Sequence, residues 1–124
     1  MVDASALLAV LQQETGAAKL TLSMLSKAVI SAVNLAEVHG KLIQLGVPPT
    51  EAWSAASGVV RETVPFTPEQ ARIAGDLVAH TRSLGLSLGD RACLALALTL
   101  GAPVYTSDRA WKNLEIGIRI HVIR

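Results

Sequence analysis

Hydrophobic positions recur along the chain at two spacings, and each spacing predicts a type of secondary structure. Leu7, Leu8 and Leu11 fall on one face of a helix, and Gly16 follows where that helix is expected to end. Short apolar or alternating runs bounded by turn residues predict strands instead. By these criteria we expect helices over residues 5–13, 17–26, 34–45, 48–58, 67–84, 91–100 and 108–113, and strands over 1–4, 28–31, 61–66, 103–106 and 118–123.

The order of these elements predicts an α/β domain. Parallel strands need a crossover connection, so strands separated by helices indicate a central, mainly parallel sheet with helices on both faces. The strands are short and apolar, which is typical of strands that are buried on both sides. We therefore expect a three-layer fold in which the sheet lies between two sets of helices.

Two helix starts carry capping signals. Thr67 precedes Pro68 at a first helical position, and Gln70 lies where a capping box would place it. The pair Gly89-Asp90 is expected to open the strongly apolar helix over residues 91–100.

Composition limits the possible classes of protein. The chain has 124 residues, which predicts one domain over residues 1–124, and 51% of them are hydrophobic. A net charge of +1 argues against a protein that binds nucleic acid by bulk electrostatics. The longest charge-free stretch, 92–107, is interrupted by polar and turn residues, so no membrane span is expected. The first residues lack the basic start of a signal peptide, and Cys93 is the single cysteine, so we expect a cytoplasmic location.

Acidic residues stand at the ends of predicted strands and the starts of predicted helices. Asp3 and Asp108 each follow a strand, Asp90 heads the apolar helix, and Glu37 lies one turn after Asn34. Capping alone accounts for each aspartate taken singly, because aspartate is among the best helix N-cap residues. Several acids at the carboxyl edge of a parallel sheet would instead repel one another unless a cation lies among them. Oxygen ligands of this kind suit Mg²⁺ or Mn²⁺ rather than zinc.

Four segments in order carry a family resemblance over essentially the whole chain. They are VDASALLA at 2–9, SAVNLAEV at 31–38, LSLGDRACLALA at 86–97 and PVYTSDRAW at 103–111. Each pattern is weak by itself, but the set at this spacing is specific. The chain resembles a PIN-domain ribonuclease, and in particular a VapC-type toxin of a bacterial toxin–antitoxin pair.

The resemblance implies a role for each acid. Asp3 would be the first carboxylate of a metal site and Glu37 the second, with Asp90 and Asp108 completing an acidic pocket. Only two residues precede Asp3, where the first strand of the family is usually longer, so the first strand is expected to be truncated or to begin upstream. Four further positions match the motifs as supporting residues: Thr106 and Ser107, which orient the last acid or its water, and Ser5 and Asn34, which support Asp3 and Glu37.

The reaction implied by the resemblance is metal-dependent hydrolysis of an RNA phosphodiester, with 5′-phosphate and 3′-hydroxyl products. Carboxylate-bound Mg²⁺ activates water in such sites, and a second ion stabilises the leaving oxygen. This chemistry needs no histidine. His39, His80 and His121 show no zinc-ligand spacing, and we expect them to be structural or exposed.

Basic and aromatic residues near the acids are candidates for substrate contacts. Arg91, Arg109 and Lys112 are expected to bind RNA phosphates, with exposed first-turn residues as the simpler alternative. Trp111 has two interpretations, stacking on a base or anchoring the last short helix by packing, and we favour packing. Trp53 is expected at a helix–helix or partner contact, and Cys93 in the core.

Three other functions compete with the nuclease interpretation. A non-catalytic PIN fold that binds RNA or protein would be expected to lack one of the acids, and none is missing here. A phosphoacceptor receiver domain needs an acidic pair after its first strand, and this chain has Asp3 alone. A phosphatase with a D-x-D motif fails similarly, because Ser5 holds the second acidic position.

Partners follow from the same resemblance. A toxin of this class is held by a cognate antitoxin, whose C-terminal segment lies over the acidic pocket. The helices expected near residues 17–26 and 48–58 are low in charge and rich in apolar residues. We expect these helices to form the antitoxin groove or the face of a homodimer.

Overall fold

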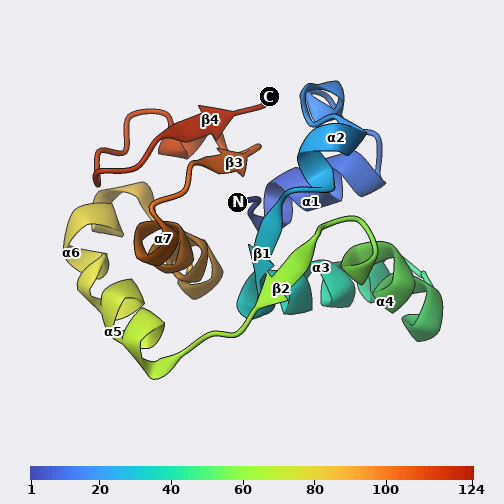
Figure 1. Ribbon diagram of the computed structural model, residues 1–124, viewed down its shortest axis with the longest axis horizontal. Helices are drawn as coiled ribbons and strands as arrows, with labels where there is room; N and C mark the ends of the chain where they lie inside the picture. The colour runs from blue at the N-terminus through green and yellow to red at the C-terminus, as the bar shows by residue number, and fades with distance from the viewer.

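The computed structural model describes all 124 residues, and its helices and strands follow the expected order with few exceptions (Figure 1). The strands are β1 (Val29–Ser31), β2 (Glu62–Val64), β3 (Val104–Thr106) and β4 (Ile120–Val122). The α-helices are α1 (Ala4–Leu11), α2 (Leu22–Leu25), α3 (Ala32–Gln44), α4 (Pro49–Ser57), α5 (Pro68–Asp76), α6 (Val78–Thr81) and α7 (Leu88–Leu100). Three short 3₁₀ helices complete the chain: η1 (Ala17–Lys19), η2 (Arg82–Leu84) and η3 (Arg109–Trp111).

The N-terminal residues join two pairs of parallel strands. β1 pairs with β2 and β3 pairs with β4, both in parallel. Between these pairs, the Val2 N–H donates to the Val29 carbonyl oxygen at 3.1 Å, and the Tyr105 N–H donates to the Met1 carbonyl oxygen at 2.9 Å. Val2 and Tyr105 also form a parallel bridge. The expected first strand is therefore present as a short segment between β1 and β3. Asp3 lies at the carboxyl end of this central segment.

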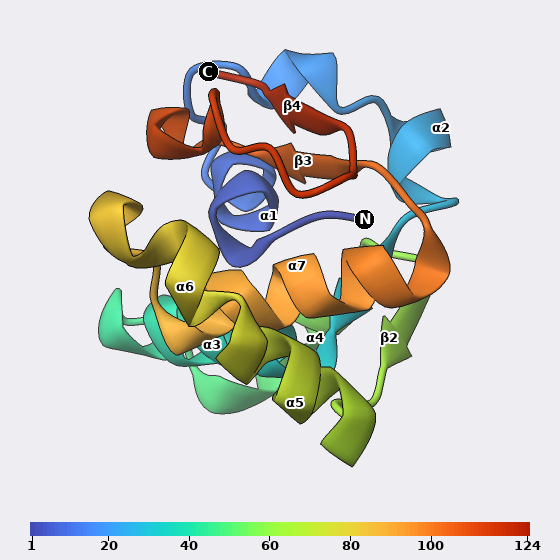
Figure 2. The same cartoon turned by 90° about the vertical axis from the view of Figure 1, so that its left-hand side faces the viewer.

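Side chains of neighbouring strand residues enter two separate hydrophobic clusters. Val2 and Ile30 belong to a cluster with α1 and α3, whereas Met1 and Val104 belong to a second cluster with α7. Successive side chains of a strand point to opposite faces, so the two clusters lie on opposite faces of the sheet. Figures 1 and 2 show α5 and α6 beside α7, and Figure 1 shows α4 on the other side of β1 and β2. This arrangement confirms the predicted three-layer α/β fold.

Two predicted helices are broken into shorter pieces. In the segment 17–26, Leu20 adopts an extended backbone (φ −99°, ψ 95°) and separates η1 from α2. Thr21 then caps α2 by accepting a hydrogen bond from the Met24 N–H. The segment 67–84 likewise divides into α5, α6 and η2, and it ends at Gly85 with a positive φ of 65°. In the first segment the break arises because a local capping residue competes with continued helix.

Helix α7 begins earlier than the sequence predicted, which corrects the position of Asp90. Ser87 is the N-cap, and its hydroxyl accepts from the Asp90 N–H at 3.2 Å. The Asp90 carboxylate in turn accepts from the Ser87 N–H at 2.9 Å. Asp90 therefore lies in the third helical position of a capping box, inside the first turn and not at the head of the helix.

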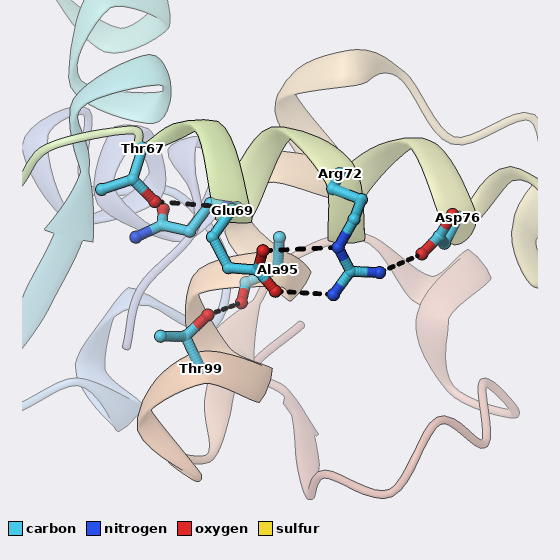
Figure 3. A network of polar contacts seen from close by, with 7 residues as sticks. Thr67, Glu69, Arg72, Asp76, Ala95 and Thr99 are labelled. Atoms are coloured by element: carbon cyan, nitrogen blue, oxygen red, sulfur yellow. Dashed lines mark hydrogen bonds and ion pairs between the residues drawn. The ribbon is translucent and has the colours of Figure 1, made fainter.

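The outer face of α5 carries a row of exposed charges (Figure 3). Arg72 forms ion pairs with Glu69 at 2.6 Å and with Asp76 at 2.8 Å. Thr67 caps this helix as predicted, by accepting from the Gln70 N–H. The reciprocal half of the predicted capping box is missing, because the Gln70 Oε1 atom is buried without a partner. These local ion pairs and the Thr67 cap stabilise α5, and the helix packs against α7.

None of the helices combines the length and the apolar character that crossing a membrane requires.

Candidate active site

Asp3 is an almost fully buried acid at the end of the central segment. It is 2% exposed, and its side chain caps α1 by accepting from the Ala6 N–H at 2.8 Å. The Ser5 hydroxyl donates to its carboxylate at 2.8 Å, and the Thr106 hydroxyl donates at 2.7 Å. No cationic side chain pairs with it. Asp3 therefore depends on neutral donors for compensation of its charge.

Burial makes the ionised form of Asp3 costly. Desolvation raises the pKa of Asp3 from its usual 3.8 to about 6, although the hydrogen bonds from Ala6, Thr106 and Ser5 act in the opposite direction. The negative charge of Asp90 raises this pKa further. An unpaired buried carboxylate of this kind is a feature of functional sites more often than of cores, where charged groups are paired or absent.

A hydroxyl network connects Asp3 to the fourth acid. The Thr106 Oγ1 atom donates to Asp3 and accepts from the Asp108 N–H at 3.0 Å. The Ser5 hydroxyl similarly accepts from the Ser107 N–H at 3.0 Å. The Asp108 carboxylate caps η3 through the Ala110 N–H at 2.9 Å. The two hydroxyls thus fix the strand end that carries Asp108 against the Asp3 carboxylate.

Glu37 is held over the start of α7 by a buried amide. The Asn34 side-chain nitrogen donates to Glu37 Oε2 at 2.9 Å and to the Gly89 carbonyl oxygen at 2.9 Å. Asn34 is 1% exposed, and its Oδ1 atom is buried without a hydrogen-bond partner. Glu37 itself is exposed. Asn34 therefore orients Glu37 and leaves one unsatisfied acceptor beside it.

Gly89 makes room for the Glu37 carboxylate. A Cβ atom built on Gly89 would overlap the carboxylate group of Glu37. The sequence patterns did not point to this residue as part of the site. The available signal was a glycine next to Asp90 at the start of the predicted helix, because glycine permits a close approach of other groups to the backbone. Its position next to Asp90 brings Glu37 and Asp90 to the same turn of α7.

The charges of three of the acids raise the pKa of one buried thiol. Cys93 is fully buried in α7, as predicted, and burial raises the pKa of its thiol well above the usual range. The negative charges of Asp3, Asp90 and Glu37 raise this pKa further. These three acids come from three separate parts of the chain, and each lies near enough to Cys93 for its charge to raise this pKa. Asp108 joins them through Thr106.

The donor chemistry of this acidic site fits a hard divalent cation. All four acids offer carboxylate oxygens, and the orphaned Asn34 Oδ1 atom is a further oxygen at the same place. No group of three or more His, Cys, Asp or Glu side chains is close enough to enclose an ion by itself. The acids therefore do not form a preformed cage, and their roles as ligands stay predictions.

Of the three basic residues predicted to bind substrate, Arg91 makes a hydrogen bond within the protein. Its Nη1 atom donates to the Ala74 carbonyl oxygen at 2.9 Å, which ties α7 to α5. Arg91 therefore contributes to helix packing and makes no ion pair with the acids, and its contact with substrate stays a prediction. Arg109 and Lys112 are exposed and line a hollow beside β4.

Aromatic and histidine side chains lie where packing explains them. Trp111 is fully buried among the residues packed on α7, so it has no face free to stack on a base. Trp53 is 50% exposed and meets His39 edge to face, with ring centroids 5.4 Å apart. His121 stacks on Tyr105 at 4.7 Å, and His80 is exposed. None of these rings takes part in the hydrogen-bond network of the acids.

Comparison with known proteins identifies the fold. A family model for the PIN domain matches residues 1–117. The chain is similar to a chain of VapBC2 from Rickettsia felis, solved bound to a DNA fragment from its promoter, with a TM-score of 0.73, 16% identity and coverage of 97% of this chain and 95% of that chain. It is also similar to VapBC-5 from Mycobacterium tuberculosis, a member of the VapBC family of toxin–antitoxin systems, with a TM-score of 0.51, 20% identity and coverage of 80% and 98%. No curated protein matches the sequence.

Proposed function

The chain belongs to the PIN domain family, and from this premise we propose that it is a metal-dependent endoribonuclease of the VapC toxin type. The reaction is hydrolysis of RNA phosphodiester bonds to 5′-phosphate and 3′-hydroxyl ends. One observation supports the proposal: hydrogen bonds link Asp3 to the Asp108 backbone through Thr106, and link Glu37 through Asn34 to the first turn of α7, which carries Asp90.

Asp3, Glu37, Asp90 and Asp108 would hold Mg²⁺ or Mn²⁺. When bound, such an ion would supply Lewis-acid chemistry: it would lower the pKa of a water molecule and offset negative charge at the phosphate. The supporting residues orient the acids through hydrogen bonds that do not require a bound ion. Thr106 and Ser5 fix the orientation of the Asp3 carboxylate through their hydroxyls.

Asn34 and Gly89 position the second acid. The amide of Asn34 selects one position of the Glu37 carboxylate, and Gly89 leaves that position free. The result is a negatively charged site, which a phosphate would bind only when cations offset the charge of the acids.

The expected partners are a cognate antitoxin and a second copy of the chain in a homodimer, and the expected location is the cytoplasm. The solved relatives are described as VapBC toxin–antitoxin proteins, which supports an antitoxin partner. Leu22 is 85% exposed on α2 and Trp53 is 50% exposed on α4. Both lie in the two apolar segments that the sequence predicted as partner faces, and exposed large apolar groups of this kind suit a protein interface.

The central test is RNA cleavage by the purified chain with Mg²⁺, with Mn²⁺ and with EDTA. Asp3→Asn and Asp90→Asn should each abolish cleavage while leaving the protein folded. Asp76→Asn is the matched control, since this exposed aspartate pairs with Arg72 on the outer face of α5. Cleavage that persists in EDTA, or in both variants, would contradict the proposed mechanism. RNA binding without cleavage under any metal would favour a non-catalytic PIN module instead.

A further inference from the structure

A basic hollow of about 440 Å³ opens between η3 and β4. Its size falls within the range of natural ligand sites, which is about 300–1,000 Å³. Four of its six lining residues are basic and none is acidic. The lining residues are Arg109, Lys112, Ile120, His121, Val122 and Arg124.

The basic side chains of this hollow form no ion pair. The ion pairs of the molecule involve Arg72 alone, so Arg109, Lys112 and Arg124 have no acidic partner. These three side chains are exposed. Glu14 shares a neighbouring hollow with Arg124 but forms no ion pair with it. Like charges in one concavity repel, and an anion placed among them relieves that repulsion.

The basic hollow lies beside the acidic site. Asp108 caps η3, and Arg109 is the next residue of the chain. The Ile123 N–H donates to the Thr106 carbonyl oxygen at 2.9 Å, so the end of β4 lies next to the strand end that carries Thr106. The carboxyl ends of parallel strands meet at one edge of a sheet. A polyanion at the acids can therefore continue along this edge into the basic hollow.

The basic hollow and the acidic site have opposite requirements. The acids accept a phosphate only together with cations, whereas the basic hollow attracts a phosphate directly through arginine and lysine. The positive charge is concentrated here, because three of the 11 Lys and Arg side chains of the chain line this one hollow and no Asp or Glu does. It suits a ligand that carries several separated negative charges.

We propose that this basic hollow binds a backbone phosphate of single-stranded RNA, at a nucleotide other than the one that is cleaved. The proposal rests on the proposed nuclease function, and it adds Arg124 and His121 to the residues that contact the substrate. The bound phosphate sets the direction in which the RNA strand crosses the acids. Short substrates that span only the scissile bond do not reach it.

The test measures equilibrium binding of a short fluorescent oligoribonucleotide in EDTA, so that no cleavage occurs. The double variant Lys112→Gln/Arg124→Gln is compared with wild type and with Lys41→Gln/Arg82→Gln, which removes two exposed cations from α3 and η2. The first variant should bind about fivefold more weakly, and the log–log slope of its affinity against salt should fall by about 0.7 for each phosphate that it no longer neutralises. The control should match wild type. Equal affinity for all three proteins would overturn the proposal.

Cleavage assays separate this proposal from the nuclease function. With metal, the single variant Arg124→Gln, which keeps Lys112, should cleave a dinucleotide as wild type does and a longer oligoribonucleotide less efficiently. Weaker binding by the double variant, with no cleavage by any of the proteins, would refute the nuclease function and support the hollow as an RNA site. Normal cleavage of long RNA by the single variant would refute the proposal that the hollow binds RNA, and it would leave the nuclease function standing. Competition by polyglutamate equal to that by RNA would assign the hollow to acidic peptides and overturn the proposal.

Discussion

The carboxylate of Glu37 on α3 occupies the space above Gly89 on α7 where any other residue would place its Cβ atom. Asn34 fixes this relationship by donating both to Glu37 and to the Gly89 carbonyl oxygen. The close approach brings the second acid to the turn that carries Asp90. A glycine that costs helix stability therefore has a positional reason to be in this helix.

Gly89→Ala should displace Glu37 and lower RNA cleavage by about tenfold or more, because a small misplacement of a catalytic group is costly. The protein should stay folded, since the displaced group is the end of a flexible side chain. Gly75→Ala is the matched control: it adds a methyl group in α5 where nothing lies within 4 Å, and it should stabilise the protein by about 0.5–1 kcal/mol with activity unchanged. Full activity of Gly89→Ala would show that the position of Glu37 is unimportant.

Asp3→Asn should stabilise the metal-free protein at neutral pH. The pKa of Asp3 is about 6 in the folded state against 3.8 usually, so folding is penalised when the carboxylate is ionised in both states. The penalty is absent below about pH 4, grows between about pH 4 and 6, and reaches about 3 kcal/mol above about pH 6. Asparagine also keeps the N-cap.

Chemical denaturation of both proteins at several pH values, with EDTA present, measures this effect. The advantage of Asp3→Asn over wild type should vanish near about pH 4, where the carboxyl group is protonated in the folded state. Asp76→Asn should bring no comparable gain, since Asp76 is exposed and paired with Arg72. A wild type that is more stable than Asp3→Asn in mildly alkaline buffer would contradict the cost assigned to the buried carboxylate.

Thr106→Val should reduce both stability and activity. The substitution keeps the shape of the side chain but removes the donor to Asp3 and the acceptor for the Asp108 N–H. Loss of a buried hydrogen bond to a charged group costs about 1.5–3 kcal/mol. Thr106→Ser should recover most of the activity, because it restores the hydroxyl. Thr99→Val in α7 removes only a hydroxyl bonded to the Ala95 carbonyl oxygen. We expect Thr99→Val to lose less stability and less activity than Thr106→Val.

Mg²⁺ or Mn²⁺ should raise the melting temperature of wild type, and EDTA should reverse the change. A ligand that binds only the folded state stabilises it by about 2.7 kcal/mol at a concentration about 100 times its dissociation constant. Asp3→Asn should lose most of this gain, and Asp76→Asn should retain it. Thermal shifts that are identical in the three proteins would place the cation outside the acids.

Local features of this fold could be predicted from the sequence because they depend on residues a few positions apart. The order of helices and strands follows from the spacing of apolar residues, and the caps at Thr67 and Asp108 join groups two or three residues apart. The three aspartates were found because each lies at or near the end of an element, whereas Glu37, inside α3, was found through the family resemblance. The breaks in the segments 17–26 and 67–84 were missed; in the first, the Thr21 cap competes with continued helix within about 1 kcal/mol.

Tertiary structure alone decided which distant groups meet. The bond from Thr106 to Asp3 joins residues 103 positions apart, and the bond from Asn34 to Gly89 joins residues 55 apart. The same is true of the Arg91 contact with Ala74 and of the meeting of η3 with β4 in the basic hollow. Such contacts depend on how strands are ordered in the sheet and how helices pack on it. The sequence therefore determined which residues are chemically equipped for the reaction, and the packing of the sheet and its helices determined their mutual positions.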